Sequence, residues 1–227
     1  MRNNIFILSL GGSLIVPGEV DHEFLKAFVA LIRKKTQTGN RFIIVCGGGG
    51  VNKLYNQAAT KTRAMTNDEL DWIGIYATRY NAEFIRILFS DLAYGKVAAN
   101  PHKKFKTKKP VIIGAGYMPG WSSDYDAVYL AKTYGAKTVV NLSNIDYAYD
   151  KDPKTFPDAK IIENISWTDF RKIVGNEWKP RMNTPFDPIA SKEAQKLKLK
   201  VIVMNGKNIS NLENLIDGKD FKGTIVS

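Results

Sequence analysis

Two short apolar runs in the sequence each end in a cluster of glycines. Residues 5–10 lead into Gly11-Gly12-Ser13, and residues 42–46 lead into the four glycines 47–50. A buried strand that breaks on residues without side chains lets backbone N–H groups approach an anion closely. Two such strand ends in one sheet could hold two phosphate groups that face each other. This arrangement suggests phosphoryl transfer.

Two further predicted strands end in similar residues. Gly114-Ala115-Gly116 follows residues 111–113, and Ser143-Asn144 follows residues 138–142. In open parallel sheets, ligands collect at the carboxyl ends of the strands. One glycine after a strand is most often a simple turn, but four such ends on one side of a sheet favour a ligand site.

Neither common nucleotide-binding fingerprint is present in the sequence. The pattern G-x-x-x-x-G-K-[ST] does not occur, which excludes a P-loop enzyme. The glycines 47–50 also lack the spacing of the dinucleotide-binding motif, and no acidic residue ends the next strand. The sequence therefore indicates a different phosphate-binding scaffold.

The elements that must position these strand ends alternate along the chain. Residues 5–46 form a strand, a helix and a strand of the length expected for a βαβ unit, which predicts a parallel sheet. We expect strands at 5–10, 42–46, 97–99, 111–113, 138–142, 201–204 and 224–226. We expect helices at 21–35, 49–64, 67–89, 124–134, 166–174, 189–198 and 210–216.

Local signals set several boundaries of these elements. Asp21 is expected to cap the first long helix, Ser122 or Ser123 the helix at 124–134, and Ser166 with Asp169 to form a capping box. Residues 145–163 are predicted to form a hairpin excursion, and residues 179–188 a loop. The expected fold class is α/β, a three-layer α/β/α sandwich with a mainly parallel central sheet, in a single domain spanning 1–227.

Composition narrows the class of protein. The chain has 227 residues, and it contains no apolar stretch of membrane-spanning length and no recognisable secretion signal. Cys46 is the only cysteine, which fits a reducing compartment, and we expect the protein to be cytoplasmic. We expect the Cys46 thiol to be buried and structural. The two histidines, His22 and His102, lie near no cysteine or carboxylate pair at ligand spacing, which excludes a histidine–cysteine zinc site.

The net charge of +11 is partly concentrated in the lysine-rich run 103–109. Such a run could bind nucleic acid. A solvated loop is the favoured interpretation, because the run holds one aromatic residue, has no repeat and ends at Pro110 before a strand. A basic balance also suits a protein that handles nucleotides. We expect no nucleic-acid and no membrane partner.

Several motifs together resemble the amino acid kinase superfamily and, within it, the archaeal-type uridylate (UMP) kinases. The resemblance covers almost the whole chain. Its most specific elements are Asp-x-x-Gly after the triple glycine and the Asn-x-Asp segment that leads to Tyr-x-x-Asp-Pro. The motifs occur in family order as Leu8–Ser13, Gly47–Gly49, Asp71–Ile75, Pro119–Asp124, Asn144–Pro153 and Phe186–Pro188.

The resemblance implies an ATP side of the site. The phosphates of ATP would lie against Ser9, Leu10, Gly11, Gly12, Ser13, Gly49 and Lys53. The adenosine would be held by Ser143, Asn144, Tyr149 and Asp152. Two of these residues have structural alternatives, since Tyr149 could be a surface aromatic and Asp-Pro at 152–153 is a turn dipeptide.

The resemblance also implies a UMP side and a centre between the two nucleotides. UMP would be contacted by Gly48, Asp71, Tyr117, Met118, Pro119, Gly120, Trp121, Ser122 and Ser123. Asp71 would accept the ribose hydroxyls, although it could be a helix-end charge favoured by the dipole. Asp124 would organise the centre and act in catalysis together with Lys53. For Asp126 and Asp146 we favour a structural role, the alternative being that either helps to organise a Mg²⁺ shell.

The sequence departs from the family pattern at the first glycine cluster. Many members carry a lysine in the first strand just before the glycines, where its charge reaches the transferred phosphoryl group, and this chain has Ser9. Lys53 stands where arginine is frequent, and Tyr147 replaces the usual glycine after Asn-x-Asp. The missing positive charge would come from Lys53, from Mg²⁺ or from another lysine that the sequence does not identify.

The implied activity is ATP-dependent phosphorylation of UMP to UDP by direct in-line transfer, a step of pyrimidine nucleotide synthesis. Mg²⁺ would accompany ATP as cofactor, and the family implies a homohexamer. One alternative keeps the fold and changes the acceptor to isopentenyl phosphate, carbamate or N-acetylglutamate. A non-catalytic nucleotide-binding protein on this fold is a second alternative, and a nucleic-acid-binding module that uses the 103–109 lysines is a third.

Overall fold

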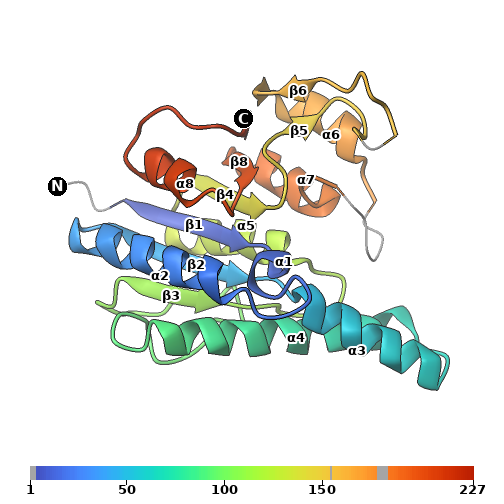
Figure 1. Ribbon diagram of the computed structural model, residues 1–227, viewed down its shortest axis with the longest axis horizontal. Coiled ribbons are helices and arrows are strands. Elements are labelled where there is room, and N and C mark those ends of the chain that lie inside the picture. The colour runs from blue at the N-terminus through green and yellow to red at the C-terminus, as the bar shows by residue number, and fades with distance from the viewer. Residues whose placement is uncertain (1–3, 154, 178–183) are drawn as a thin grey trace.

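A computed structural model of the chain describes residues 4–153, 155–177 and 184–227 and contains a seven-stranded sheet in the order β3-β2-β1-β4-β8-β9-β7. Its first five strands are parallel, and β9 runs antiparallel to β8 at one end (Figure 1). The strands of this sheet are β1 (Ile5–Leu10), β2 (Arg41–Cys46), β3 (Val111–Gly114), β4 (Thr138–Ser143), β7 (Asn164–Ile165), β8 (Lys200–Asn205) and β9 (Thr224–Val226). The predicted α/β class with a mainly parallel sheet is confirmed.

Helices cover both faces of the sheet. On one face a core cluster joins the strands to α1 (Gly12–Ile15), α2 (His22–Gln37), α4 (Asn67–Leu88) and α8 (Ile209–Ile216). On the other face a second cluster joins them to α5 (Ser123–Tyr134), α6 (Trp167–Val174) and α7 (Pro188–Lys196). α3 (Gly49–Thr62) packs on α4. The three-layer prediction is therefore confirmed.

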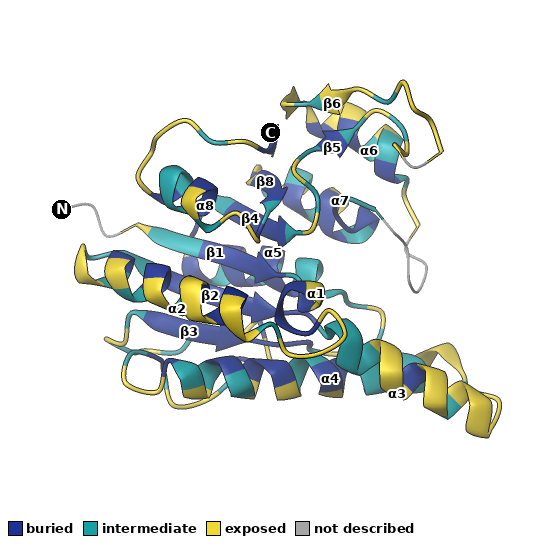
Figure 2. Ribbon diagram, in the orientation of Figure 1, coloured by how far each residue is buried: buried dark blue, intermediate teal, exposed yellow. Residues whose placement is uncertain are grey.

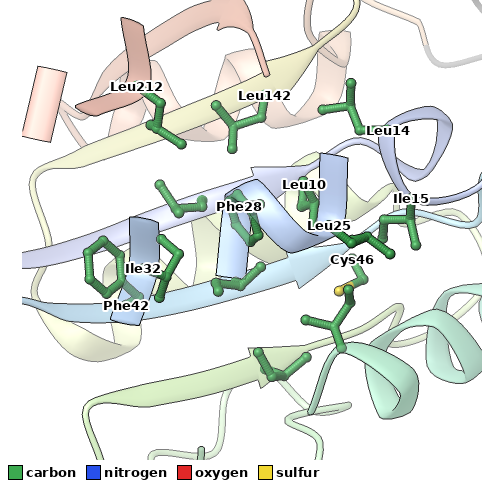
Figure 3. Close-up of a cluster of buried hydrophobic side chains, with 14 of the residues drawn as sticks. Leu10, Leu14, Ile15, Leu25, Phe28, Ile32, Phe42, Cys46, Leu142 and Leu212 are labelled. Atoms are coloured by element: carbon green, nitrogen blue, oxygen red, sulfur yellow. The ribbon is translucent and has the colours of Figure 1, made fainter. Parts of the chain in front are cut away.

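The strands are buried on both faces, as expected of a covered parallel sheet. Figure 2 shows dark blue strands between helices whose outer faces are yellow. In the first cluster Phe28 and Ile32 of α2 lie over Leu10 and Phe42 of the sheet (Figure 3). Cys46 belongs to this core, and burial raises the pKa of its thiol far above the ordinary value. The expectation of a buried structural thiol is confirmed.

Most predicted boundaries agree with the structure to within about two residues. Asp21, Ser122 and Ser166 cap α2, α5 and α6 through their side chains. The excursion is a hairpin of β5 (Ala148–Tyr149) and β6 (Ile161–Ile162), and Ala148 N–H donates to the Thr224 hydroxyl of β9 at 2.8 Å. Of the predicted loop 179–188, residues 179–183 lie outside the described residues.

Three details differ from the prediction. The strand expected at 97–99 is wrong, because Ala98 forms only an isolated bridge to Gly114 before Asn100-Pro101 turns the chain away. The short helix α1 and the two-residue strand β7 were not predicted, since neither is long enough to show a periodic pattern. No described helix is long and apolar enough to span a membrane.

Candidate active site

The two glycine runs meet at the carboxyl ends of β1 and β2. A Cβ on Gly47 would lie 2.5 Å from Gly12 N, and a Cβ on Gly12 would lie 2.7 Å from Gly47 O. Gly49 has φ +55°, and a Cβ there would overlap with Gly12 O. Side chains at these positions would push the runs apart, so glycine is required by close backbone approach as well as by backbone conformation. The prediction that both glycine-ended strands end on one side of the same sheet is confirmed, and the contact between the two runs is a finding of the structure.

Backbone hydrogen bonds fix this meeting point to the sheet. Gly11 N–H donates to Leu142 O and Gly47 N–H to Leu10 O, each at 2.9 Å. The second run is also held from α4, where the buried Asn81 amide donates to Gly47 O at 2.8 Å and to Gly48 O at 3.1 Å. α3 begins at Gly49, and its N-cap Gly48 has no side chain to take up the first-turn N–H groups. A helix N-terminus of this kind favours an anion.

A carboxylate centre lies beside the first glycine run. The buried Ser9 hydroxyl of β1 donates to Asp124 Oδ1 at 2.9 Å, and Asp187 N–H donates to Asp124 Oδ2 at 3.3 Å. Desolvation raises the pKa of Asp124 to about 6, and the nearby Asp187 carboxylate adds to that rise. Burial also raises the pKa of Asp187, which caps α7. Three elements that are distant in sequence thus converge on Asp124.

Lys53 lies in α3, the helix that begins at the second glycine run. It is exposed on α3, one turn after Gly49, and it lines a cavity of about 320 Å³ with Gly49, Asn52, Asn56 and Gln57. Among the described residues, the hydrogen-bond partners of the Asp124 carboxylate are Ser9 and Asp187, not Lys53. The structure therefore brings Lys53 to the glycine runs without a direct contact to the carboxylate centre.

The predicted UMP residues gather around one loop. Asp71 of α4 accepts from Gly120 N–H at 2.9 Å, and Gly120 has φ +79°. Trp121 stacks edge-on with Tyr117 at 5.3 Å and with Tyr125 at 4.4 Å between ring centroids. Met118 is exposed, Pro119 is half-buried, and Ser122 caps α5 just before Ser123. The structure thus joins Asp71 to the 117–123 segment, from which it is distant in sequence.

The predicted adenosine residues lie along the end of β4 and the hairpin. Ser143 O accepts from Gly206 N–H at 2.9 Å, and Asn144 follows as an exposed residue. Tyr149 is half-buried in β5 opposite Ile161. Asp152 O accepts from Thr155 N–H and Phe156 N–H, which is the turn that the Asp-Pro dipeptide indicates. Their contact with adenosine stays a prediction.

Sequence reasoning missed four residues that hold this site, and it gave a fifth, Asp126, a structural role without a partner. Asp187 contacts Asp124 and was assigned no role, although its place before Pro188 marked it as a helix cap. Asn81 anchors the second glycine run, and its burial could have been inferred from its apolar neighbours at helical spacing. Thr78, Arg79 and Asp126 hold the start of the 116–120 loop. No sequence signal marked Thr78 and Arg79, whereas Asp126 was noted as a carboxylate near the strand ends.

Comparison with known proteins agrees with this geometry. The model of the amino acid kinase family matches residues 4–205, and the chain belongs to that family. A protein named uridylate kinase from Sulfurisphaera tokodaii is 33% identical over 214 residues, which cover 91% of this chain and 93% of that protein. Another from Thermococcus kodakarensis is 33% identical over 97% of this chain and 98% of its own length.

Solved structures give the same result at the level of the fold. The crystal structure of uridylate kinase from Archaeoglobus fulgidus superposes with a TM-score of 0.81 at 28% identity, and the match covers 99% of this chain and all of that one. UMP kinase from Ureaplasma parvum superposes with a TM-score of 0.77 at 20% identity, over the full length of both chains. The second likeness concerns the fold alone.

Proposed function

We propose that the chain transfers the γ-phosphoryl group of ATP to UMP and forms ADP and UDP. The observation that carries this proposal is the contact between two glycine runs, Gly11-Gly12 and Gly47–Gly49, beside the Asp124 carboxylate. Two backbone anion sites at touching strand ends suit two nucleotides whose phosphates meet. The family and the names of the relatives support UMP as the acceptor.

We assign the donor side to the first run and its neighbours. The phosphates of ATP would lie against Ser9 to Ser13, with Gly49 and Lys53 completing this side. The adenosine would lie toward Ser143, Asn144, Tyr149 and Asp152. Mg²⁺ would enter with ATP as part of that substrate, and it would supply positive charge at the phosphates. Among the described residues, no cluster of three His, Cys, Asp or Glu side chains could hold a metal ion.

We assign the acceptor side to the second run and the loop after β3. Gly48 would approach the phosphate of UMP, and Asp71 would accept from its ribose hydroxyls. Residues 117–123 would enclose the uracil and the phosphate. Asp71 contacts Gly120 in this loop, so one carboxylate could hold the loop and the ribose in the same register.

In the transfer step, an oxygen of the UMP phosphate would attack the γ-phosphorus in line. The bond from that phosphorus to the bridging oxygen would break, and ADP would leave. A phosphate dianion needs no general base, so positioning and charge stabilisation would carry the rate. Asp124 and Asp187 place negative charge at the centre, and an approaching phosphate therefore needs the positive charge of Mg²⁺ and Lys53.

The test is a turnover screen with ATP and Mg²⁺. Purified protein is incubated with UMP, CMP, isopentenyl phosphate, carbamate or N-acetylglutamate, and ADP is measured together with the phosphorylated product. We expect UDP from UMP at a rate well above that with any other acceptor. Turnover of a different acceptor would overturn the assignment of UMP. Tight binding of ATP and UMP without turnover would instead favour a non-catalytic nucleotide-binding protein, an alternative that Ser9 keeps open.

We also propose that this single domain acts in the cytoplasm as a homo-oligomer, a hexamer by family resemblance. Aromatic side chains of α4 point to solvent at helical spacing, with Trp72 41%, Tyr76 63% and Tyr80 72% exposed. Leu54 and Tyr55 of α3 are exposed as well. Such a patch suits contact with another copy. Analytical ultracentrifugation of the wild type against Tyr76→Glu tests this, and a monomeric wild type would refute it.

A further inference from the structure

Side chains of α4 form hydrogen bonds with the start of the loop at residues 116–120. Gly116 N–H donates to the Thr78 hydroxyl at 2.8 Å. Arg79 Nε donates to Gly116 O at 3.2 Å, and the Arg79 guanidinium donates again to Tyr117 O at 3.0 Å. Two neighbouring residues of one helix thus bind the backbone of two neighbouring residues of the loop.

Asp126 completes this arrangement from α5. Its Oδ2 accepts from Tyr117 N–H at 3.2 Å, so both backbone polar groups of Tyr117 are bound by side chains. The side chain is fully buried, and Oδ1 has no hydrogen-bond partner among the described residues. A buried carboxyl group with one unpaired oxygen is costly, and an apolar residue of similar size would avoid that cost.

The electrostatics agree with a specific role for this carboxyl group. Burial raises the pKa of Asp126 to about 8, and the Arg79 guanidinium opposes that rise. Near neutral pH the group is therefore mainly uncharged, and its oxygen can accept from Tyr117 N–H without a full buried charge. Asp126 of α5 and Arg79 of α4 thus bind the same loop residue, Tyr117, and the other end of the loop is bound at Gly120 N–H by Asp71.

We propose that Asp126 is a positioning residue for the acceptor nucleotide, and that with Thr78 and Arg79 it sets the conformation of the 116–120 loop. The inference rests on the proposed function, which places UMP against this loop. Asp126 acts through Tyr117, and it does not touch the reacting phosphates. Its loss should therefore impair the use of UMP and leave the binding of ATP unchanged.

The test compares two variants at one position. Asp126→Leu removes the acceptor for Tyr117 N–H while keeping the number of side-chain heavy atoms, and Asp126→Asn keeps an oxygen acceptor. We expect Asp126→Leu to raise the KM for UMP about fivefold to tenfold, with the KM for ATP within about twofold of the wild type. Asp126→Asn should stay within about twofold of the wild type for both substrates. Equal increases in both KM values, or no rescue by asparagine, would overturn the proposal.

A packing control separates positioning from general destabilisation. Val128 is fully buried on the same helix, and Val128→Ala removes buried volume without touching the loop. A selective increase in the KM for UMP in this variant would contradict the proposal. If Asp126→Leu does not fold, Thr78→Val provides the same test. Valine is nearly isosteric with threonine but lacks the hydroxyl that accepts from Gly116 N–H.

A measurement without substrate keeps this inference separable from the proposed function. Hydrogen exchange of the Tyr117 amide should be at least about tenfold faster in Asp126→Leu than in the wild type and nearly unchanged in Asp126→Asn. Unchanged exchange in Asp126→Leu would refute the positioning role even if UMP is the acceptor. Failure of the wild type to phosphorylate UMP, with the exchange result as expected, would refute the acceptor and retain the role of Asp126 in the loop.

Discussion

Two regions of the candidate site are held by different means. The glycine runs approach each other through backbone atoms, with Gly47 N–H bound to Leu10 O and Gly11 N–H to Leu142 O, and the Asn81 amide of α4 binds the second run. The 116–120 loop is bound instead by side chains of two helices, with Asp71 of α4 at one end and Asp126 of α5 near the other. The first arrangement tolerates no added atoms, whereas the second depends on particular polar groups. Substitutions should therefore affect the two sides through different measurements.

Gly12→Ala should have the largest effect, because it attacks the side built from backbone. The new Cβ would lie 2.7 Å from Gly47 O and 2.6 Å from Gly47 C, and neither run can move without breaking a sheet hydrogen bond. We expect a loss of about 3 kcal/mol in the free energy of unfolding and a fall in kcat/KM of about a hundredfold or more. Chemical denaturation and steady-state kinetics measure the two effects.

Gly18→Ala is the matched control for this substitution. A Cβ at Gly18 meets no atom within 4 Å, so stability and activity should stay near those of the wild type. Comparable losses in both variants would mean that the close approach of the two runs does not limit the protein.

Asp124→Asn tests the centre between the two sides. The pKa of Asp124 is raised to about 6, so the carboxylate that accepts from Ser9 is lost as the pH falls through about 6. We expect wild-type kcat to decrease below that pH, and Asp124→Asn to lower kcat at pH 8 about a hundredfold. The variant should also lose the step near pH 6. The same pH profile in both proteins would assign that step to another group.

Asp71→Ala tests the side built from side chains. Loss of the carboxylate frees Gly120 N–H and removes the proposed acceptor of the ribose hydroxyls, so the KM for UMP should rise about tenfold. The KM for ATP should change by less than about twofold. Asp68→Ala, in the first turn of the same helix, is the control and should change neither value. An equal rise for both substrates would refute the assignment of Asp71 to the acceptor.

The smallest expected effect concerns the Asp126 region, through the pH dependence of the free energy of unfolding. The pKa of Asp126 is about 8 in the folded protein, above the ordinary 3.8, so the folded state retains this proton at higher pH than the unfolded state. The folded state therefore loses stability from this group as the pH rises from about 4 to about 8. Relative to Asp126→Asn, the wild type should lose about 1 kcal/mol or more over that range. Denaturation series at several pH values measure this, and parallel curves would contradict the raised pKa.

Much of the fold could be predicted because its signals are local. The apolar strands before Gly11 and Gly47, the caps Asp21 and Ser122 and the βαβ spacing each act within a few residues. The prediction of a strand at 97–99 was wrong because pairing there depends on the edge of the sheet rather than on the residues of the segment itself. The two-residue strand β7 pairs only because β9 lies beside it.

The positions of the glycines in the candidate site could be predicted from the sequence, whereas the contacts of its side chains could be predicted only in part. Gly12 and Gly47 lie at strand ends, and the rule for parallel sheets places such ends together. That Ser9 would donate to Asp124 could not be inferred, since 115 residues separate them along the chain. Asp126 carried no motif at all, and its burial against Tyr117 follows from the packing of α5 against the sheet.

The sequence by itself determined that two glycine-ended strands would lie side by side in a parallel sheet, with their carboxyl ends at the same edge. Chain connectivity enforces this, because βαβ units repeat one strand direction. Only the tertiary structure decided which groups complete this edge. Ser9 and the Asp187 N–H donate to Asp124. Arg79 and Asp126 bind the backbone of Tyr117. A hydrogen bond between elements that are distant in sequence forms only after the layers have packed, and packing sets which side chains face each other.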